Sequence, residues 1–401
     1  MRILVLASTY PLGPQDSTPG FVHELCRRLA VKGHQVFVLT PHMPGAPTIQ
    51  ILDGVHVHRY RYCPEALEQL VGPGGVMSRL RQRRWRLLLV PFLLVAMAWN
   101  YITTCRRRRI ELVHAHWLIP QGLVAAAMRP FTGNLPLVCT AHGGDLFALR
   151  GPRFRSLRRL IVARANVVAL VSNYMRDVLA SEGVASNKLE VAPMGVDLLE
   201  RFVPDPQIAR NANLLVFVGR LVEKKGVRHL LDAFAEIRHR HVNAQLRIIG
   251  DGPERAALER QADVLGIRTN VEFLGARPSD ALPAQYSEAA IAVVPSVIDR
   301  GGDQEGLGLV TIEAAGCGCA LVVSDLDAIR DVVSDKVTAL VTKAGDHSSL
   351  AMAIDRLLDD PALRERLADA AKNHVRATFD WTVVTERYES LFQRAQRESA
   401  R

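Results

Sequence analysis

The feature of the sequence that most constrains the fold is a twice-repeated alternation between short apolar runs and amphipathic helical patterns. Such alternation is typical of βαβ units and predicts parallel sheets with helices packed on their faces. In the first half the predicted strands lie at residues 2–7, 35–40, 112–114, 137–140, 167–171 and 188–192, and the first predicted helix at residues 20–31. We therefore predict an α/β fold.

A second series of the same kind begins at Asn213. Its predicted strands lie at residues 214–218, 245–249, 271–274, 291–294, 320–323 and 339–341, and its predicted helices at residues 227–238, 254–265 and 381–396. A proline-containing stretch at residues 202–207 is predicted to link the two series. Because 401 residues exceed one ordinary α/β unit, we predict two Rossmann-like domains, residues 1–198 and 199–378, and a C-terminal helical segment, residues 379–401.

Positive charge is concentrated in the first half of the chain. Residues 1–198 contain 24 Lys and Arg against 11 Asp and Glu, a balance of +13, whereas residues 199–401 contain 26 against 30, a balance of −4. Arginines flank an apolar segment at residues 87–102, and no acidic residue occurs between Glu68 and Glu111. We expect these basic residues to interact with a binding partner of the first half of the chain.

The apolar segment at residues 87–102 admits three interpretations. It is either a core helix with solvated ends, or a helix that rests on an anionic membrane surface through residues 79–109, which the basic run at residues 150–164 supports. A transmembrane helix is disfavoured, because the segment falls short of the ~20 residues that a bilayer requires and would interrupt the α/β series. We expect no nucleic-acid partner, since no aromatic-rich binding motif accompanies the arginines.

The cysteines and the N-terminus predict a cytoplasmic protein. The six cysteines lack the spacing of a metal site or a redox pair, which predicts free thiols in a reducing compartment. The apolar run after Met1 turns directly into a loop and predicts a first strand, since a signal peptide has a longer apolar region. The triplet from Asp325 to Asp327 matches a short metal-binding pattern without a third ligand nearby, so we expect no metal and no cofactor.

The segment from Glu305 to Glu313 is the strongest candidate site. It follows a predicted strand and is predicted to open a helix, whose first N–H groups would form an anion site for a diphosphate. The predicted substrate-binding residues there are Gly306, Leu307, Gly308 and Leu309. Glu305 at the helix entrance and Glu313, roughly 12 Å further along the axis, are suited to two hydroxyl-rich groups on either side of a pyrophosphate. Alternatively, Glu305 is only a helix-entrance charge and Glu313 a surface residue.

Two cations follow the first strand of the second series. Arg220 stands at the carboxyl end of that predicted strand, where parallel sheets bind ligands, and Lys225 lies just before the next helix. Both are suited to neutralise a leaving diphosphate. Taken as isolated residues, they are more often solvated surface charges.

A histidine and an aspartate follow a strand of the first series. In the segment Thr-Ala-His-Gly-Gly-Asp, His142 and Asp145 are predicted to face the ligand-binding edge of that sheet, although a lone loop histidine is usually structural. For His114 and His116, which also lie near a strand end, we expect a packing role.

Taken together, these segments resemble glycosyltransferase family 4, and the similarity covers nearly the whole chain. The motifs that carry it are the loop at residues 11–20, Val-His-Ala-His-Trp117, Ala-His-Gly-Gly-Asp145, Val-Ser-Asn-Tyr174, Pro-Met-Gly-Val-Asp197, Val-Gly-Arg-Leu221 with Lys-Gly226, Gly-Asp-Gly-Pro253 and the paired glutamates Glu305 and Glu313. The resemblance implies the GT-B fold, in which two Rossmann-like domains face each other across a cleft and the C-terminal helix crosses back to the N-terminal domain. It also implies that the first domain binds the acceptor and the second a nucleotide-sugar.

The resemblance further implies roles for individual residues. Arg220 and Lys225 would hold the donor diphosphate, Glu313 the ribose and Glu305 the transferred sugar. His142 would lie near the reacting sugar and the acceptor, and Gly20 near the donor phosphates. The family is retaining and does not require a metal. The chain departs from common family patterns at Pro19, at Met194 and at residues 324–330, which weakens any prediction of the sugar.

We therefore predict a retaining glycosyltransferase that moves a hexose from a nucleoside-diphosphate sugar to a polysaccharide, glycolipid or other glycan. The predicted location is cytoplasmic, with peripheral contact at the inner face of the membrane as the alternative. Two rival functions remain open, a nucleotide-sugar epimerase of the same architecture and a non-catalytic nucleotide-sugar-binding protein. Donor consumption that depends on an added acceptor distinguishes the transferase from both.

Overall fold

The computed structural model describes residues 1–13, 20–72 and 75–399, and residues 14–19 of the predicted loop at residues 11–20 lie outside this set. The chain forms two compact units. The first comprises Met1–Pro193 together with the C-terminal residues from Thr385, and the second comprises Met194–Val384. The chain therefore passes from one unit to the other twice.

The first unit is built on an eight-stranded sheet with the order β3-β4-β2-β1-β5-β6-β7-β8. Its strands are β1 (Arg2–Leu6), β2 (Gln35–Pro41), β3 (Ile49–Leu52), β4 (Val55–Tyr60), β5 (Leu112–His116), β6 (Leu137–Ala141), β7 (Val167–Leu170) and β8 (Leu189–Val191). All neighbours pair in parallel except β3, which pairs antiparallel with β4. Every residue of β5, β6 and β7 is buried, as expected for central strands covered on both faces.

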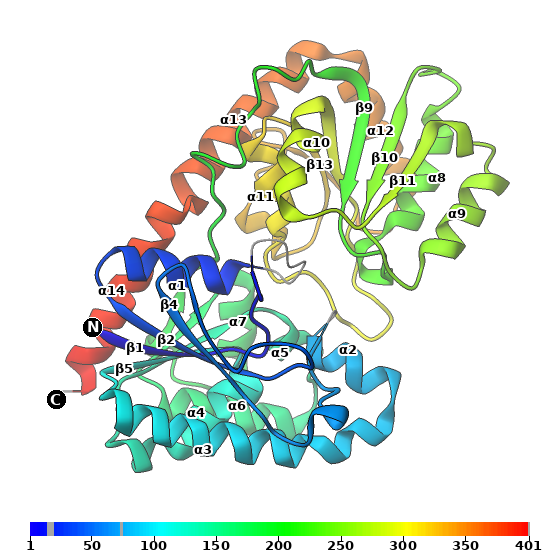
Figure 1. The fold of residues 1–401 in the computed structure, drawn as a ribbon. Helices are drawn as coiled ribbons and strands as arrows, with labels where there is room; N and C mark the ends of the chain where they lie inside the picture. The colour runs from blue at the N-terminus through cyan, green and yellow to red at the C-terminus, as the bar shows by residue number, and fades with distance from the viewer. Residues whose placement is uncertain (14–19, 73–74, 400–401) are drawn as a thin grey trace. The chain divides into compact units, whose positions relative to one another are not determined.

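Helices cover both faces of this sheet (Figure 1). They are α1 (Phe21–Val31), α2 (Gly75–Gln82), α3 (Val90–Arg108), α4 (Leu123–Met128), α5 (Gly144–Phe147), α6 (Pro152–Arg164), α7 (Asn173–Ser181) and α14 (Trp381–Ser399). Helix α3 packs on α4, and α4 packs on α6, so these three form one layer. Helix α1 lies on the opposite face and buries Val22, Leu25, Cys26 and Leu29, whose spacing places them on one side of a helix.

The second unit contains a six-stranded sheet, parallel throughout, with the order β11-β10-β9-β12-β13-β14. Its strands are β9 (Asn211–Val218), β10 (Gln245–Ile249), β11 (Val271–Gly275), β12 (Ala289–Val294), β13 (Ala320–Ser324) and β14 (Leu340–Thr342). Its helices are α8 (Val227–Ile237), α9 (Arg255–Val264), α10 (Leu282–Glu288), α11 (Leu309–Gly316), α12 (His347–Asp359) and α13 (Pro361–Phe379). Because β9 and β12 are neighbours and parallel, their carboxyl ends lie at the same edge of the sheet.

The C-terminal helix returns to the first unit, as predicted. The Tyr388 hydroxyl donates to the Ala192 carbonyl at 3.1 Å, and the Glu389 carboxylate lies 2.6 Å from Lys32 Nζ and 3.0 Å from His34 Nε2. These contacts join residues far apart in the sequence and hold α14 against the first sheet.

The stretch at residues 202–207, predicted as a linker, lies inside the second unit instead. The Phe202 side chain is buried, with its ring 6.4 Å from that of Tyr286, and the Asp205 N–H donates to the Ser287 hydroxyl at 3.1 Å. Burial of this aromatic side chain explains why the stretch packs against the unit rather than spanning a gap.

Candidate functional site

The second unit brings Lys225 and Glu305 together at the carboxyl edge of its sheet. Lys225 ends a short 3-10 turn (Glu223–Lys225) after β9, and Glu305 lies in the loop after β12. Their charged groups form an ion pair, with Lys225 Nζ 2.5 Å from Glu305 Oε1. This edge is where parallel α/β sheets bind ligands, so the two predicted residues occupy a suitable position.

Close backbone approach explains this arrangement. At Gly226, where φ is 66°, an added Cβ would lie 1.8 Å from the Pro295 carbonyl oxygen. At Gly250, after β10, an added Cβ would lie 1.8 Å from the carbonyl oxygen of Gly219. Only glycine fits these positions, so the loops that follow β9, β10 and β12 pack backbone against backbone. This packing brings the 3-10 turn next to the loop that carries Glu305.

A second ion pair lies beside the first. Lys224 Nζ is 3.2 Å from Asp303 Oδ2 and donates to the Gln304 carbonyl at 3.4 Å. Burial alone would raise the pKa of Glu305, but the positive charges of Lys225 and Lys224 outweigh burial and hold this pKa below its usual value. Glu305 is therefore ionised at neutral pH. The Arg220 side chain is exposed at the same edge, two residues beyond β9.

Glu313 lies on α11, which begins later than the sequence predicts. The helix begins at Leu309, with Gly308 before it in the left-handed region at φ 82°. Glu305 therefore stands four residues before the helix, so the prediction that it marks the helix entrance is wrong. The reason is the positive φ of Gly308, which keeps Gly306 and Leu307 in the preceding loop.

The Glu313 carboxyl is largely removed from water. Burial raises the pKa of this carboxyl to about 7, although the charge of Arg201 opposes the shift. The Tyr286 hydroxyl donates to Glu313 Oε2 at 3.5 Å. A carboxyl group held half-ionised near neutral pH is unusual and is a feature of ligand sites.

In the first unit, His142 directly follows β6 and lies in a cluster of rings. The ring centroid of His116 is 5.1 Å away, that of Trp117 4.9 Å and that of Phe21 5.1 Å. His142 Nε2 and His116 Nδ1 share a hydrogen bond of 2.9 Å. Burial lowers the pKa of His142 to about 3, so the imidazole is neutral at physiological pH. Phe21 directly follows Gly20, which places the start of α1 beside His142.

Asp145 holds the loop that carries His142. Its side chain is 2% exposed, and its carboxylate accepts hydrogen bonds from the backbone N–H groups of Leu118 at 2.8 Å and of His142 and Gly143 at 3.2 Å each. Asp145 was predicted to bind substrate, and in this structure its buried carboxylate positions the loop by accepting from three backbone N–H groups.

Two residues that the sequence did not single out contribute to these sites. Lys224 stands beside Lys225, and the adjacency of two lysines after a predicted strand was a sequence signal that could have identified it. Tyr286 comes from α10 and is distant in sequence from Glu313, so only the packing of α10 on α11 reveals the contact. His114 and His116 are buried on β5, in agreement with the predicted packing role.

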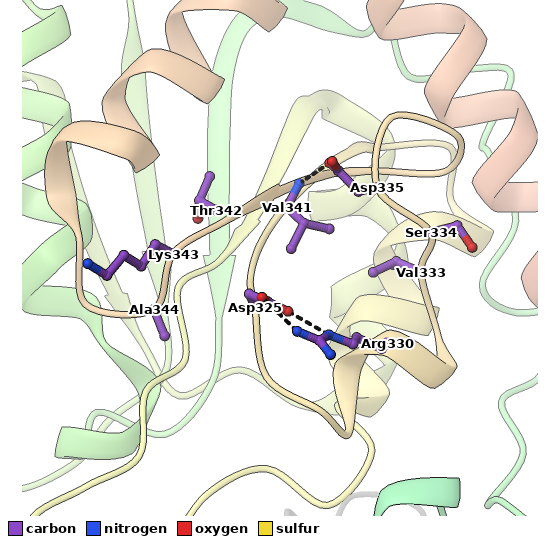
Figure 2. A pocket seen from close by; sticks show the side chains of 9 residues that line it. All are labelled: Asp325, Arg330, Val333, Ser334, Asp335, Val341, Thr342, Lys343 and Ala344. Atoms are coloured by element: carbon purple, nitrogen blue, oxygen red, sulfur yellow. Dashed lines mark hydrogen bonds and ion pairs between the residues drawn. The ribbon is translucent and has the colours of Figure 1, made fainter.

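Among the described residues of the second unit, side chains at the carboxyl edge of the sheet line more than one pocket. One of about 690 Å³ is drawn in Figure 2, where the Arg330 guanidinium bonds both carboxylate oxygens of Asp325, at 2.8 and 2.9 Å. The Asp325 carboxylate of the Asp325–Asp327 triplet is therefore paired with a cation. Another pocket, of about 680 Å³, adjoins Gly226 and Arg300. Neither is lined by Lys225, Glu305 or Glu313.

Within the described residues, one group of side chains brings three candidate metal-ligand atoms within 4.8 Å of one another, and it comprises His241, Asp355 and Asp359. The Arg240 guanidinium lies 2.5 Å from Asp355 and 3.0 Å from Asp359. Because this cation already bridges the two carboxylates, the group is explained as a surface charge cluster.

Comparison with known proteins places both units in glycosyltransferase families. Residues 21–199 match the family model described as Glycosyltransferase Family 4, and residues 200–374 match the one described as Glycosyl transferases group 1. The GDP-mannose-dependent alpha-(1-6)-phosphatidylinositol monomannoside mannosyltransferase of Mycolicibacterium smegmatis is 32% identical, over 68% of this chain and 73% of its own. Glycogen synthase of Mycobacterium tuberculosis is 26% identical, over 99% of this chain and 95% of its own. Sucrose-phosphate synthase from Thermosynechococcus elongatus has a similar structure, with a TM-score of 0.81 at 22% identity and complete coverage of both chains. This likeness, with the two parallel-sheet units, shows the GT-B fold.

Proposed function

Because the chain belongs to family 4 of the glycosyltransferases, we propose that it transfers a hexose from a nucleoside-diphosphate sugar to a glycolipid or glycan acceptor with retention of anomeric configuration. The observation that carries this proposal is the Lys225–Glu305 ion pair at the carboxyl edge of the second sheet. It places a cation for phosphate oxygens next to a carboxylate for sugar hydroxyls. Both are needed to hold a sugar joined to a diphosphate.

The second unit is the proposed donor site. Arg220 and Lys225 bind the diphosphate, and their positive charge stabilises the negative charge that develops as the diphosphate leaves. Glu305 accepts hydrogen bonds from the sugar and Glu313 from the ribose. The loop at Gly306–Gly308 and the first helical residue, Leu309, approach the phosphates through backbone N–H groups. Because two side-chain cations supply this charge, we propose that transfer requires neither a metal nor a cofactor.

The first unit is the proposed acceptor site. His142 is neutral and its Nε2 is bonded to His116, so its other ring nitrogen, Nδ1, can donate or accept one hydrogen bond beside the reacting sugar without placing a charge there. Gly20, whose proposed role is near the donor phosphates, stands at the start of α1 next to the same ring cluster. A glycolipid acceptor is supported by the phosphatidylinositol mannoside named for the mycobacterial relative. The buried state of five of the six cysteines, all free thiols, supports a cytoplasmic location.

A thermal-shift titration with UDP, GDP, ADP and CDP, without added metal, tests the donor site. We expect selective stabilisation by one diphosphate, and loss of that stabilisation in Arg220→Ala. Incubation of the matching nucleotide-sugar with and without a glycolipid acceptor then tests transfer. Donor consumption that does not depend on acceptor would instead indicate an epimerase, and binding without consumption would indicate a non-catalytic protein.

A further inference from the structure

One helix of the first unit has an apolar face that its own unit does not cover. Within the described residues, the helical stretch Arg84–Arg108 is the one long and apolar enough, by length and composition, to cross a membrane. Only 22% of its most apolar part is buried inside the protein. A monomeric soluble protein rarely exposes so many contiguous apolar side chains without a partner for them.

The exposed apolar side chains form a stripe along one side of the helix. Phe92 is 61% exposed, Val95 69% and Trp99 69%, and Leu88 continues the stripe one turn earlier. Phe92, Val95 and Trp99 are spaced by three and four residues, which keeps them on one side of α3 over roughly 10 Å at 1.5 Å per residue. Leu88 lies in the 3-10 stretch Arg84–Leu89 that directly precedes α3.

The opposite side of the helix is part of the core. Leu93, Met97, Tyr101 and Cys105 recur every four residues and are all buried, where α3 contacts α4, β2 and β4. A helix fixed along one side by its own unit cannot be surrounded by lipid. The sequence left open whether this segment is a core helix or a membrane-contacting helix, and the structure gives it one face of each kind.

Arginines stand at both ends of the apolar stripe. Arg83 and Arg84 are exposed before it, and the exposed residues after it are Arg106, Arg107, Arg108 and Arg109. The Arg106 guanidinium donates to the Phe131 carbonyl at 3.2 Å, and the Phe131 side chain is itself exposed. In Figure 1, α3 lies in the layer that it forms with α4 and α6. There the helix presents an apolar stripe bounded by positive charge.

We propose that the α3 face, defined as Phe92, Val95 and Trp99 of α3 with Leu88 of the preceding 3-10 stretch and the flanking arginines, docks in the plane of an anionic lipid bilayer surface. The apolar side chains enter the boundary between head groups and acyl chains, and the arginines bind lipid phosphates. An uncharged apolar partner would leave the arginines without counter-charges, and a second copy of the same face would bring like charges together. The docking requires neither a donor nor sugar transfer. Failure of the proposed reaction would therefore not refute the docking, and failure of the docking would not refute the reaction.

Sedimentation with vesicles tests the proposal. We expect the full chain to bind vesicles of equal parts phosphatidylcholine and phosphatidylglycerol, and to bind vesicles of phosphatidylcholine alone at least tenfold more weakly. The triple variant Phe92→Gln, Val95→Gln, Trp99→Gln should lose binding to the anionic vesicles by at least tenfold. Since these side chains are exposed and glutamine is a good helix former, the variant should keep the circular dichroism spectrum and unfolding temperature of the wild type.

Matched control variants distinguish docking by this face from nonspecific adsorption of exposed apolar side chains to vesicles. The variant Ile49→Gln, Ile51→Gln, Val264→Gln removes equally exposed apolar side chains elsewhere, and it should bind anionic vesicles as the wild type does. The variant Arg84→Gln, Arg107→Gln should weaken binding and reduce its dependence on salt. Equal loss in the control variant, or unchanged binding in the triple variant, would overturn the proposal.

Two further readouts identify what covers the face. Fluorescence of the bound wild type should be quenched by lipids brominated on their acyl chains, and quenching should fall in Trp99→Phe. Sedimentation equilibrium without lipid should show the same mass for the wild type and the triple variant. A wild-type dimer that dissociates in the variant would assign the face to a second copy, and resistance to alkaline carbonate extraction would indicate a spanning helix. Either result would overturn in-plane docking.

Discussion

The ammonium group of Lys225 and the carboxylate of Glu305 are 2.5 Å apart and largely shielded from water. Each is the counter-charge of the other, so neither is buried as an isolated ion. Donor binding would bring phosphate oxygens to Lys225 and sugar hydroxyls to Glu305. The pair therefore keeps both groups charged and in place until the proposed ligand arrives.

Replacing Lys225 by Met should reduce kcat/KM by about 100-fold or more, because it removes a cation that acts on the leaving diphosphate. It also leaves Glu305 buried without its main partner, so the pKa of that carboxyl should rise. The control is Lys224→Met, which breaks the neighbouring pair with Asp303 and should reduce kcat/KM far less. Equal losses in steady-state assays of the two variants would contradict a specific role for Lys225.

Glu313→Gln should stabilise the protein at alkaline pH while weakening donor binding. Burial raises the pKa of Glu313 to about 7, so the folded state binds this proton more tightly than the unfolded state does. The stability that the protonated Glu313 carboxyl gives the folded state is therefore fully present below the unfolded pKa of this group. That stability is lost as pH rises through about 7. The raised pKa corresponds to a cost of up to about 3 kcal/mol in the unfolding free energy at about pH 8.

Urea unfolding at two pH values checks this prediction. The glutamine variant should exceed the wild type in unfolding free energy at about pH 8 and match it at about pH 4, below the unfolded pKa of the carboxyl. Isothermal titration with the preferred diphosphate should show weaker binding by the variant at the higher pH, because the amide accepts fewer hydrogen bonds than a carboxylate. Equal unfolding free energies of the wild type and the variant at both pH values would show that burial of the ionised Glu313 does not destabilise the protein.

Asp145→Ala should destabilise the first unit by about 1–3 kcal/mol, because three backbone N–H groups lose their shared acceptor. Asp145→Asn keeps one acceptor oxygen and should be affected less. Unfolding temperature and kcat/KM should fall together in the alanine variant, since the loop carrying His142 loses its support. Loss of donor affinity with unchanged stability would instead support the prediction that Asp145 contacts the substrate.

The sheets were the most predictable part of the fold. The strands predicted at residues 35–40, 245–249 and 320–323 match β2, β10 and β13 to within one residue, because continuous apolar runs bounded by turns are distinctive. The antiparallel β3-β4 hairpin was missed. Its signs in the sequence were the turn residues Asp53 and Gly54 and the alternation of valine and histidine over residues 55–58.

The candidate site was predictable in its residues but not in its contacts. The pattern around Lys225 and Glu305 located both at strand ends, yet the ion pair depends on backbone packing at Gly226, which requires three-dimensional structure. The burial of Asp145 was also beyond the sequence, because an aspartate after a Gly-Gly pair fits an exposed loop equally well. The sequence also could not show which side of α3 is exposed, because an apolar run does not indicate which side of the helix packs against its neighbours.

Chelation should leave activity unchanged if Arg220 and Lys225 supply the positive charge on the leaving diphosphate. We expect initial rates with excess EDTA to equal those with Mg²⁺ or Mn²⁺, because no metal is needed to neutralise that charge. The Arg220→Ala variant should be slow in every condition, and added metal should not rescue it. Activity lost with EDTA and recovered with Mn²⁺ would refute the proposed metal independence.

Gly308→Ala should raise KM for the donor by about tenfold, because the substitution disturbs the loop between Glu305 and α11. The φ of 82° is strained for any residue with a Cβ, at a cost of about 1–3 kcal/mol. The new methyl group would also lie 2.7 Å from Ile329 Cδ1. The chain supplies a matched control in Gly301→Ala, in the same loop but outside the left-handed region, where only the Asp299 side chain must shift. Adding Ile329→Val to Gly308→Ala removes the clashing atom and should recover part of the donor affinity, whereas no recovery would place the whole effect in backbone strain.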